Sequence, residues 1–527
     1  MLCSRIARAL LGASPLYTLN TSIFRLCRAQ DTARMASLSS SLQWYSNLTS
    51  VKQLAYSTIK ITNGADIERL YPLLLSYANN STRANSLREV IVDTYSWPSH
   101  YSIFYDTDDP VLLPQESGEG LDAKRANRRY VDHDAHSFLE RHVTSLGLED
   151  HLTGLIVEAL AWKKQHWLGH VPDDTRDFDD RETAFAAAAL VVLFSLCENL
   201  SVLRIDSFPA VTKEYLLRNN YGQINRPALR RLETVEFFKE EPLDSRLYET
   251  VDFLEYFRIF GRLPTMSILI MEGVFDHEVV DLVFPGTTNI RRIQLSHIEI
   301  SGWTLSMIIR APKVLEELRI STCGLWALDP GMFDMPCKTI GKSLLQHRST
   351  LRILDLDVSF GHGEDRSREE LLDQFLAQSV EVYLNLDKES SDIPFWLDDI
   401  PDDRPYGSTI GSLHDFNAMT HLSIGISALL GPPYEIQEPP FRLVDALPPN
   451  LEYLCLYGYV KGEIGKLDVH VEEFMQHKES RFPQLVEVQG VDKTIMGIAN
   501  FYAGYDRLDE EDLWKWPEKE WKWIEAY

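Results

Sequence analysis

A short apolar pattern returns along most of this chain and limits what it can fold into. The pattern is an apolar residue, two unrestricted positions, an apolar residue, one unrestricted position and a third apolar residue. The last two apolar residues are two apart, so they point to the same face of a β-strand. The copies comprise Val51, Leu54 and Tyr56; Leu87, Val90 and Val92; Leu200, Leu203 and Ile205; Leu232, Val235 and Phe237; Met266, Leu269 and Met271; Ile290, Ile293 and Leu295; Leu315, Leu318 and Ile320; Leu351, Leu354 and Leu356; Met419, Leu422 and Ile424; Leu451, Leu454 and Leu456; and Leu485 with Val488.

The spacing of these copies favours one strand and one helix per unit. Stretches with helical spacing, such as 248–257 and 340–345, lie between the copies. From Leu200 onward the copies start 24 to 36 residues apart, except for one gap of 68 residues that holds a degenerate copy at Leu384 and Leu386. Units of this length predict an α/β leucine-rich-repeat solenoid, an irregular horseshoe with a parallel concave sheet and outer helices. The alternative is an ordinary α/β domain whose strands share the pattern by chance.

The repeats divide the chain into segments. We expect residues 1–45 to be a disordered or leader segment and residues 46–500 to be the solenoid. A helical and acidic insertion is predicted at 93–199, and an acidic surface loop at 387–411, where acids, Pro and Gly follow no period. Residues 501–527 are predicted to be a C-terminal cap or tail.

Charge and composition exclude several classes of protein. The net charge of −26 should repel nucleic acid and anionic membranes. The longest apolar stretch, 184–197, is shorter than the roughly 20 residues of a spanning helix, so it predicts a buried helix. Six cysteines without a C-x-x-C pair predict reduced thiols and a cytoplasmic or nuclear protein. Residues 1–40 carry five arginines and one aspartate, so mitochondrial targeting is an alternative.

Several segments resemble a known family. They are 184–205 (AFAAAALVVLFSLCENLSVLRI), 411–425 (GSLHDFNAMTHLSIG), 443–463 (LVDALPPNLEYLCLYGYVKGE) and 467–490 (LDVHVEEFMQHKESRFPQLVEVQG). Over roughly residues 45–500 the chain resembles fungal leucine-rich-repeat proteins of the F-box type. The resemblance implies repeats that hold a substrate and an N-terminal F-box that docks on the Skp1 adaptor of a ubiquitin ligase. The Leu-Pro opening of an F-box is missing, and 5–28 is the nearest stretch.

Motifs for catalysis and cofactor binding are absent from the sequence. No phosphate-binding loop, dinucleotide fingerprint, H-E-x-x-H or G-x-S-x-G occurs, so we expect no enzyme activity and no cofactor. Three groups could ligate a metal, but capped turns and solvated acids are the alternative for each, and we predict no metal site. The groups are His133, Asp134, His136 and His142; His166 and His170; and Asp173, Asp174, Asp177, Asp179 and Asp180.

The predicted site is a surface for another protein. Strand positions that alternate with core positions should face the concave side of the sheet. Mixed Arg, aromatic and acidic side chains there suit a protein interface, and a solvated face without a partner is the alternative. The predicted residues are Arg204, Asp206, Glu236, Phe238, Arg292, Gln294, Glu317, Arg319, Asp355, Asp357, Tyr453 and Tyr457.

Three functional hypotheses follow from the sequence. The first is a non-catalytic substrate receptor of F-box type whose adaptor-binding end is degenerate or lost. The second is a stand-alone interaction scaffold unrelated to ubiquitination. The third is an enzyme with a site in the 93–199 insertion.

Overall fold

A computed structural model provides the fold. The described residues are 55–94, 97, 131–168, 175–238, 249–250, 253–272, 274–275, 283–298, 300, 302–322, 337–357, 409–431, 439–495 and 524–525. They all belong to one unit, Ala55–Tyr527. The expected leader at 1–45, most of the acidic loop at 387–411, the first part of the insertion and all of the tail except 524–525 lie outside the described residues.

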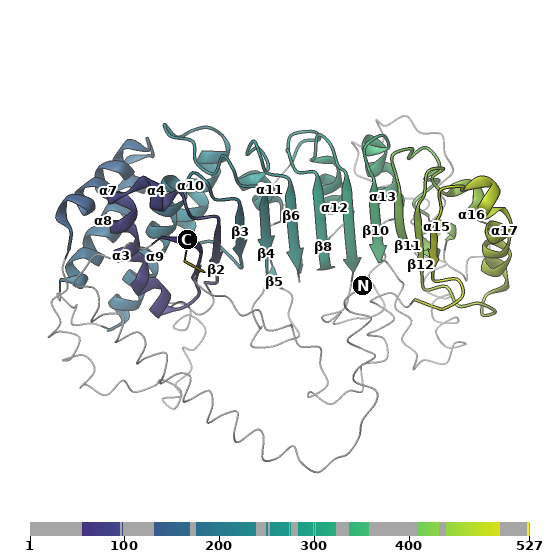
Figure 1. The fold of residues 1–527 in the computed structure, drawn as a ribbon, viewed down its shortest axis with the longest axis horizontal. Coiled ribbons are helices and arrows are strands. Elements are labelled where there is room, and N and C mark those ends of the chain that lie inside the picture. The colour runs from purple at the N-terminus through teal and green to yellow at the C-terminus, as the bar shows by residue number, and fades with distance from the viewer. Residues whose placement is uncertain are drawn as a thin grey trace, which may run out of the picture. The chain divides into compact units, whose positions relative to one another are not determined.

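Twelve strands form one sheet, and its order follows the chain from β1 to β13, with β14 beside β1 (Figure 1). Each neighbouring pair from β1 to β13 is parallel, whereas β14 runs antiparallel to β1. The α/β class with a parallel sheet is therefore confirmed. The strands are β1 (Tyr56–Ile61), β2 (Glu89–Val92), β3 (Val202–Ile205), β4 (Thr234–Phe237), β6 (Ile268–Glu272), β8 (Arg292–Ile298), β9 (Glu317–Thr322), β10 (Ile353–Asp357), β11 (His421–Gly425), β12 (Tyr453–Tyr457), β13 (Glu487–Gln489) and β14 (Ile524–Glu525).

The apolar pattern forms the core row of this sheet. The middle apolar residues of successive copies lie opposite one another in the strand register. Because strand side chains alternate between faces, one residue per copy at the same register builds a continuous apolar layer. This layer includes Leu203, Val235, Leu269, Ile293, Leu318, Leu354, Leu422 and Leu454, each at most 1% exposed. Leu232, which we also expect in the core, is fully buried just before β4.

A polar ladder precedes many of the strands. The residue just before the leading apolar position of a copy donates a side-chain hydrogen bond to a backbone carbonyl of the preceding repeat. Apart from Tyr56 at the start of β1, these carbonyls lie outside the strands, and each bond links neighbouring repeats. The donors and acceptors are Ser86 to Tyr56, Asn199 to Asn85, Thr265 to Leu232, Asn289 to Leu263, Thr350 to Leu315 and Asn450 to Asn417, at 2.8–3.1 Å.

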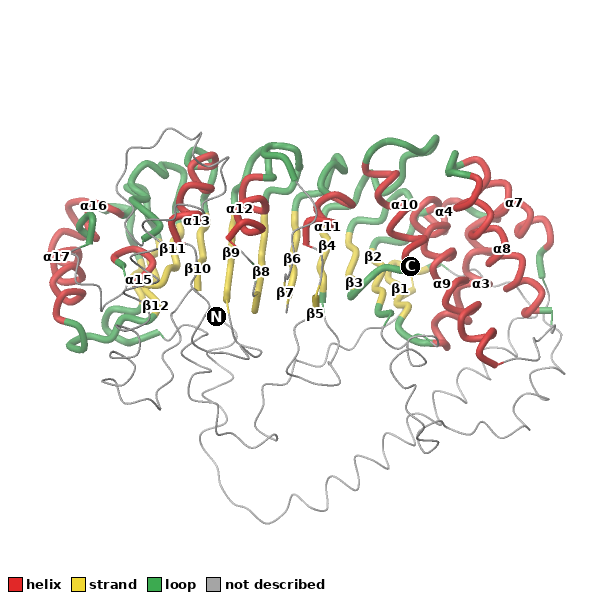
Figure 2. The backbone as a smooth tube through the Cα atoms, turned by 180° about the vertical axis from the view of Figure 1, so that it is seen from behind, coloured by secondary structure: helices red, strands yellow, loops and turns green. Residues whose placement is uncertain are grey.

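Helices connect most successive strands and lie in the same order as the strands (Figure 2). Two further short strands, β5 (Glu249–Thr250) and β7 (Val274–Phe275), form a separate parallel pair. The connecting helices are α3 (Gly64–Asn79), α4 (Ser81–Ala84), α10 (Ala210–Asn220), α11 (Phe253–Phe260), α12 (Gly302–Arg310), α13 (Cys337–Leu344) with the 3-10 turn Leu345–His347, α15 (Ile426–Leu430), α16 (Leu443–Ala446) and α17 (Gly465–Arg481).

Two strand pairs join segments that are far apart in the sequence. Strand β2 pairs directly with β3, so residues 93–199 leave the sheet and return to it. Strand β10 likewise pairs directly with β11. The gap of twice 34 residues suggested a further strand here, but β10 and β11 are direct neighbours in the sheet, and the degenerate copy at Leu384 and Leu386 lies outside the described residues.

The described part of the 93–199 excursion contains three helices, α7 (His133–Ser145), α8 (Asp150–Trp167) and α9 (Thr175–Leu196). Helix α9 packs on α3 and α8, and α7 packs on α3. Every residue of α9 from Phe185 to Phe194 is at most 3% exposed, because its alanines let the neighbouring helices approach closely. We call α3, α7, α8 and α9 the helical block.

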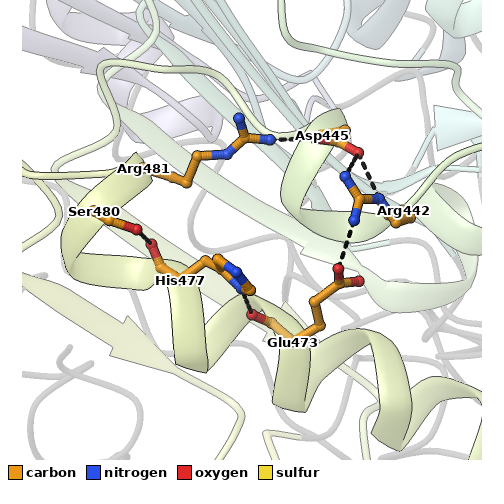
Figure 3. A network of polar contacts seen from close by, with 6 residues as sticks. All are labelled: Arg442, Asp445, Glu473, His477, Ser480 and Arg481. Atoms are coloured by element: carbon orange, nitrogen blue, oxygen red, sulfur yellow. Dashed lines mark hydrogen bonds and ion pairs between the residues drawn. The ribbon is translucent and has the colours of Figure 1, made fainter.

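Ion pairs fasten the last helices of the array (Figure 3). The Arg442 guanidinium contacts Asp445 within α16 and reaches Glu473 on α17, with N–O distances of 2.6 and 2.7 Å. Arg481 at the end of α17 also pairs with Asp445. Both arginines and Asp445 are exposed, so solvent screens these pairs. They position α16 against α17 without belonging to the sheet.

Candidate functional site

The predicted site residues lie in rows that run across the strands. We call the sheet face that carries them the alternate face, because its positions alternate with the buried core row. The first row contains Arg204, Glu236, Ile270, Gln294, Arg319, Asp355 and Ser423 at paired register positions. The second row contains Glu89, Val202, Thr234, Ile268, Arg292, Glu317, Ile353, His421 and Tyr453.

Arg204 joins three strands near the start of the array. Its Nε donates to Glu89 on β2 at 2.7 Å, and its Nη1 donates to Glu236 on β4. The three side chains are half-buried, so the pairs are less screened than pairs in open water. Arg204 and Glu236 thus fix the register of β2, β3 and β4, and two carboxylates share one guanidinium.

A second polar group spans β8 to β12. Glu317 accepts from Arg319 at 2.6 Å, and Arg292 lies 3.9 Å from its second oxygen. Asp355 lies 3.6 Å from Arg319 and accepts a 2.9 Å hydrogen bond from the Tyr457 hydroxyl. Burial raises the pKa of Asp355, and Tyr457 and Arg319 oppose that rise by favouring the carboxylate.

The most accessible cation of the two rows is Arg292. Its side chain is 56% exposed, compared with 43% for Arg319 and 29% for Arg204. A guanidinium that is more than half exposed and only loosely paired can form a new bidentate contact at small desolvation cost. Arg292 is therefore the group on this face most available to a partner.

Aromatic and aliphatic side chains flank the charged groups. The rings of His421 and Tyr453 stack with centroids 5.9 Å apart. Burial raises the pKa of Tyr453, so its hydroxyl stays protonated and can donate a hydrogen bond. Ile268, Ile270 and Ile353 are half-buried on the same face. The alternate face therefore carries apolar anchors between its charged groups.

Four predicted site residues lie outside these rows, and one of them, Tyr457, still contacts the first row through its hydrogen bond to Asp355. Phe238 was expected to be exposed on this face but is 4% exposed and buried, because β4 ends at Phe237 and the alternation ends with it. Asp206 follows the end of β3, and its carboxylate accepts hydrogen bonds from the backbone and hydroxyl of Thr94. Asp206 thus fixes the turn after β2. Asp357 ends β10, and its side chain is outside the described residues.

Sequence reasoning missed other members of the rows. Glu89 occupies the same position in its repeat as Arg292, Glu317 and Tyr453, so the alternation rule could have found it. His421 and Ile353 follow from the same rule. No local signal showed that Glu89 and Arg204, which are 115 residues apart, would pair.

The helical block contains a buried charged cluster. Lys163 on α8 is fully buried, and its Nζ lies 2.5 and 2.7 Å from the two carboxylate oxygens of Glu182 on α9. Glu68 on α3 accepts from the same ammonium at 3.2 Å. Despite Lys163, burial raises the pKa of Glu182 to about 7. The cluster ties three helices together.

The same cluster is the only set of potential metal ligands found among the described residues. His166, Glu68 and Glu182 present ligand atoms within 4.8 Å of one another. The Lys163 ammonium already contacts both carboxylates, so the chain supplies its own cation there. His166 therefore acquires two acidic neighbours that the sequence did not reveal, while His170 lies outside the described residues.

The other histidines considered as ligands point to separate partners. His136 Nδ1 lies 3.0 Å from the Tyr71 hydroxyl, and its Nε2 lies 3.2 Å from Glu140. His142 Nε2 lies 2.9 Å from the Ser195 hydroxyl, and burial lowers the pKa of His142 to about 4. Asp132 caps α7 through the amides of Asp134 and Ala135. These contacts fasten α7 to its neighbours.

Five aspartates form the third group of potential metal ligands. Asp177, Asp179 and Asp180 lie on α9, whereas Asp173 and Asp174 precede it outside the described residues. Within the described parts of the chain, no helix is both long and apolar enough to cross a membrane. No family model matches the chain, and no curated protein matches it.

Proposed function

We propose that the chain is a non-catalytic leucine-rich-repeat protein that binds another protein along the alternate face of its sheet. The leucine-rich-repeat horseshoe is supported by the apolar pattern on each strand, the chain-order sheet and the polar ladder between repeats. In such an array the alternate face is the concave, partner-binding side.

The observation that carries this proposal is the composition of the two rows. Arginine and tyrosine are the side chains that most often dominate binding energy in protein interfaces. On this face Arg292, Arg319 and Tyr453 lie within adjacent or nearby strands of one sheet, and isoleucines separate them from Arg204 and Glu236. A rigid sheet holds these groups in place before a partner arrives, which lowers the entropic cost of binding.

The partner is proposed to be a protein because the net charge of −26 disfavours nucleic acid and anionic lipid. Buried cysteine thiols at Cys197, Cys337 and Cys455 suit a cytoplasmic or nuclear location. The F-box resemblance adds a specific version, in which the bound protein is a substrate delivered through the Skp1 adaptor. Co-purification of Skp1 with the full chain tests that version separately.

The experiment compares two sets of substitutions in the full chain. Arg292→Ala, Arg319→Ala and Tyr453→Ala remove three groups from the alternate face. Arg442→Ala and Arg481→Ala form the matched control, because those arginines have similar exposure and pair with acids on the final helices (Figure 3). Exposed substitutions typically cost within about 0.5 kcal/mol, and the better-paired Arg319 about 1 kcal/mol. Circular dichroism should therefore show folded protein in both cases.

Affinity purification with mass spectrometry first identifies proteins retained by the wild type, and direct titration with the purified candidate follows. The triple variant should weaken binding at least tenfold, while the control variant binds normally. If the triple variant binds as well as the wild type, and substitutions in the helical block abolish binding, the site lies in the helical block instead.

A further inference from the structure

The first strand of the sheet, β1, has two edges with different partners. Arg88 and Asp93 donate backbone hydrogen bonds to the carbonyls of Ser57 and Ile61, so these carbonyls point toward β2. Backbone groups alternate in direction along a strand. Those of Thr58 and Lys60 therefore point toward the opposite edge, which we call the outer edge of β1, whereas the Tyr56 carbonyl at the start of the strand accepts from Ser86.

The last strand of the chain lies on that outer edge. Strand β14 runs antiparallel to β1, with Glu525 opposite Tyr56 and Ile524 opposite Thr58. It is only two residues long, whereas β1 has six, and the register shifts between the two pairs. Within the described part of the chain, the pairing stops before Lys60. Among these residues β14 therefore pairs only with the first half of β1.

The occupying strand reaches β1 from the other end of the array. Strand β13 forms the opposite margin of the sheet, and residues 496–523 connect the last described repeat to β14. At about 3.3 Å per extended residue, this connection is long enough to span eleven strands spaced about 4.8 Å apart.

We propose that the outer edge of β1 is an acceptor site for an extended peptide segment, and that its resident ligand is the chain's own C-terminal segment around Ile524. Pairing between main-chain groups supplies the affinity, as in other cases of strand addition to a sheet edge. The resident segment also shields an edge that would otherwise invite uncontrolled pairing with other chains. This inference is independent of the partner on the alternate face.

The test uses a chain that ends at Trp523 and a fluorescein-labelled peptide of residues 519–527 (KEWKWIEAY). In fluorescence anisotropy, the shortened chain should bind the peptide at least tenfold more tightly than the full chain, whose own segment competes. A peptide with Ile524→Pro and Glu525→Pro cannot donate from either residue and should lose at least tenfold in affinity. A Glu525→Ala peptide keeps the backbone donors and should bind like the original.

Two results would overturn the proposal. One is the absence of peptide binding by a shortened chain whose circular dichroism matches that of the full chain. The other is equal binding of the double-proline peptide. If the shortened chain does not fold, hydrogen exchange of the full chain carrying both prolines replaces it. The amide of Thr58, which points to the outer edge opposite Ile524, should then exchange at least tenfold faster than in the wild type, and unchanged exchange at Thr58 would also refute the site.

Discussion

Replacing Lys163 with methionine should destabilise the helical block, and the loss should depend on pH. Methionine has a similar length and an apolar character that suits the neighbouring Phe185 ring, which lies 5.0 Å from the ammonium. The substitution removes the cation and leaves the buried carboxylate of Glu182 without it. Removing one member of a buried ion pair typically costs about 3–5 kcal/mol.

The pH dependence follows from Glu182. Its pKa is raised from 4.5 to about 7 by burial, which corresponds to roughly 3 kcal/mol between the two protonation states. A carboxyl whose folded pKa exceeds its unfolded pKa favours the folded state most below the unfolded value, and that contribution is lost as pH rises toward 7. Without Lys163, which lowers this pKa, the loss should extend to higher pH. The substitution should therefore cost more at pH 8.5 than at pH 5.

Urea denaturation followed by circular dichroism, together with hydrogen exchange of α8 and α9, measures this effect. Lys164→Met is the matched control, because Lys164 is the next residue on α8 and is half-exposed. Lys164→Met should change stability by less than about 0.5 kcal/mol at either pH. If Lys163→Met behaves like the control, or costs the same at both pH values, the ion-pair reasoning is wrong.

Two further substitutions test the array itself by urea denaturation. Leu354→Ala, at a fully buried core position, should lower the free energy of unfolding by about 2–5 kcal/mol. Ile353→Ala, on the alternate face, should lower it clearly less. Equal losses would contradict the assignment of the two residues to opposite faces. Gly490→Ala should cost about 2–4 kcal/mol of stability, because φ is +84° and an added Cβ would collide with the Leu456 carbonyl. Gly286→Ala is the control, because φ is +67° but the space around it is open, and it should cost only about 1 kcal/mol. A larger loss for Gly286→Ala than for Gly490→Ala would refute the role of the collision.

The sequence predicted the strands well because burial of one residue per repeat is a local, periodic requirement. Leu203 and Leu454 could be placed in one core without knowledge of any distant contact. The alternate-face positions followed from the same period, and Phe238 failed where the strand stopped one residue earlier than the pattern.

Contacts between distant segments had no such signal. Lys163 meets Glu68 and Glu182 only because α3, α8 and α9 pack together, and the spacing of charges within one helix says nothing about that packing. Pairing of Ile524 with β1 likewise depends on a return across the whole array. Periodicity predicts which face of an element is buried, while the angle and depth of packing decide which polar groups meet.

The direct pairing of β2 with β3 has a consequence for how the chain reaches its folded state. From β3 to β10, neighbouring strands are joined by connections of a few dozen residues, so pairing can spread quickly from any local start. The β2–β3 junction instead requires an excursion of more than one hundred residues to close. The cost of closing a loop rises slowly with its length, but the search takes longer. We therefore expect the β2–β3 pairing to form late in folding, after the parts of the array on either side have nucleated independently.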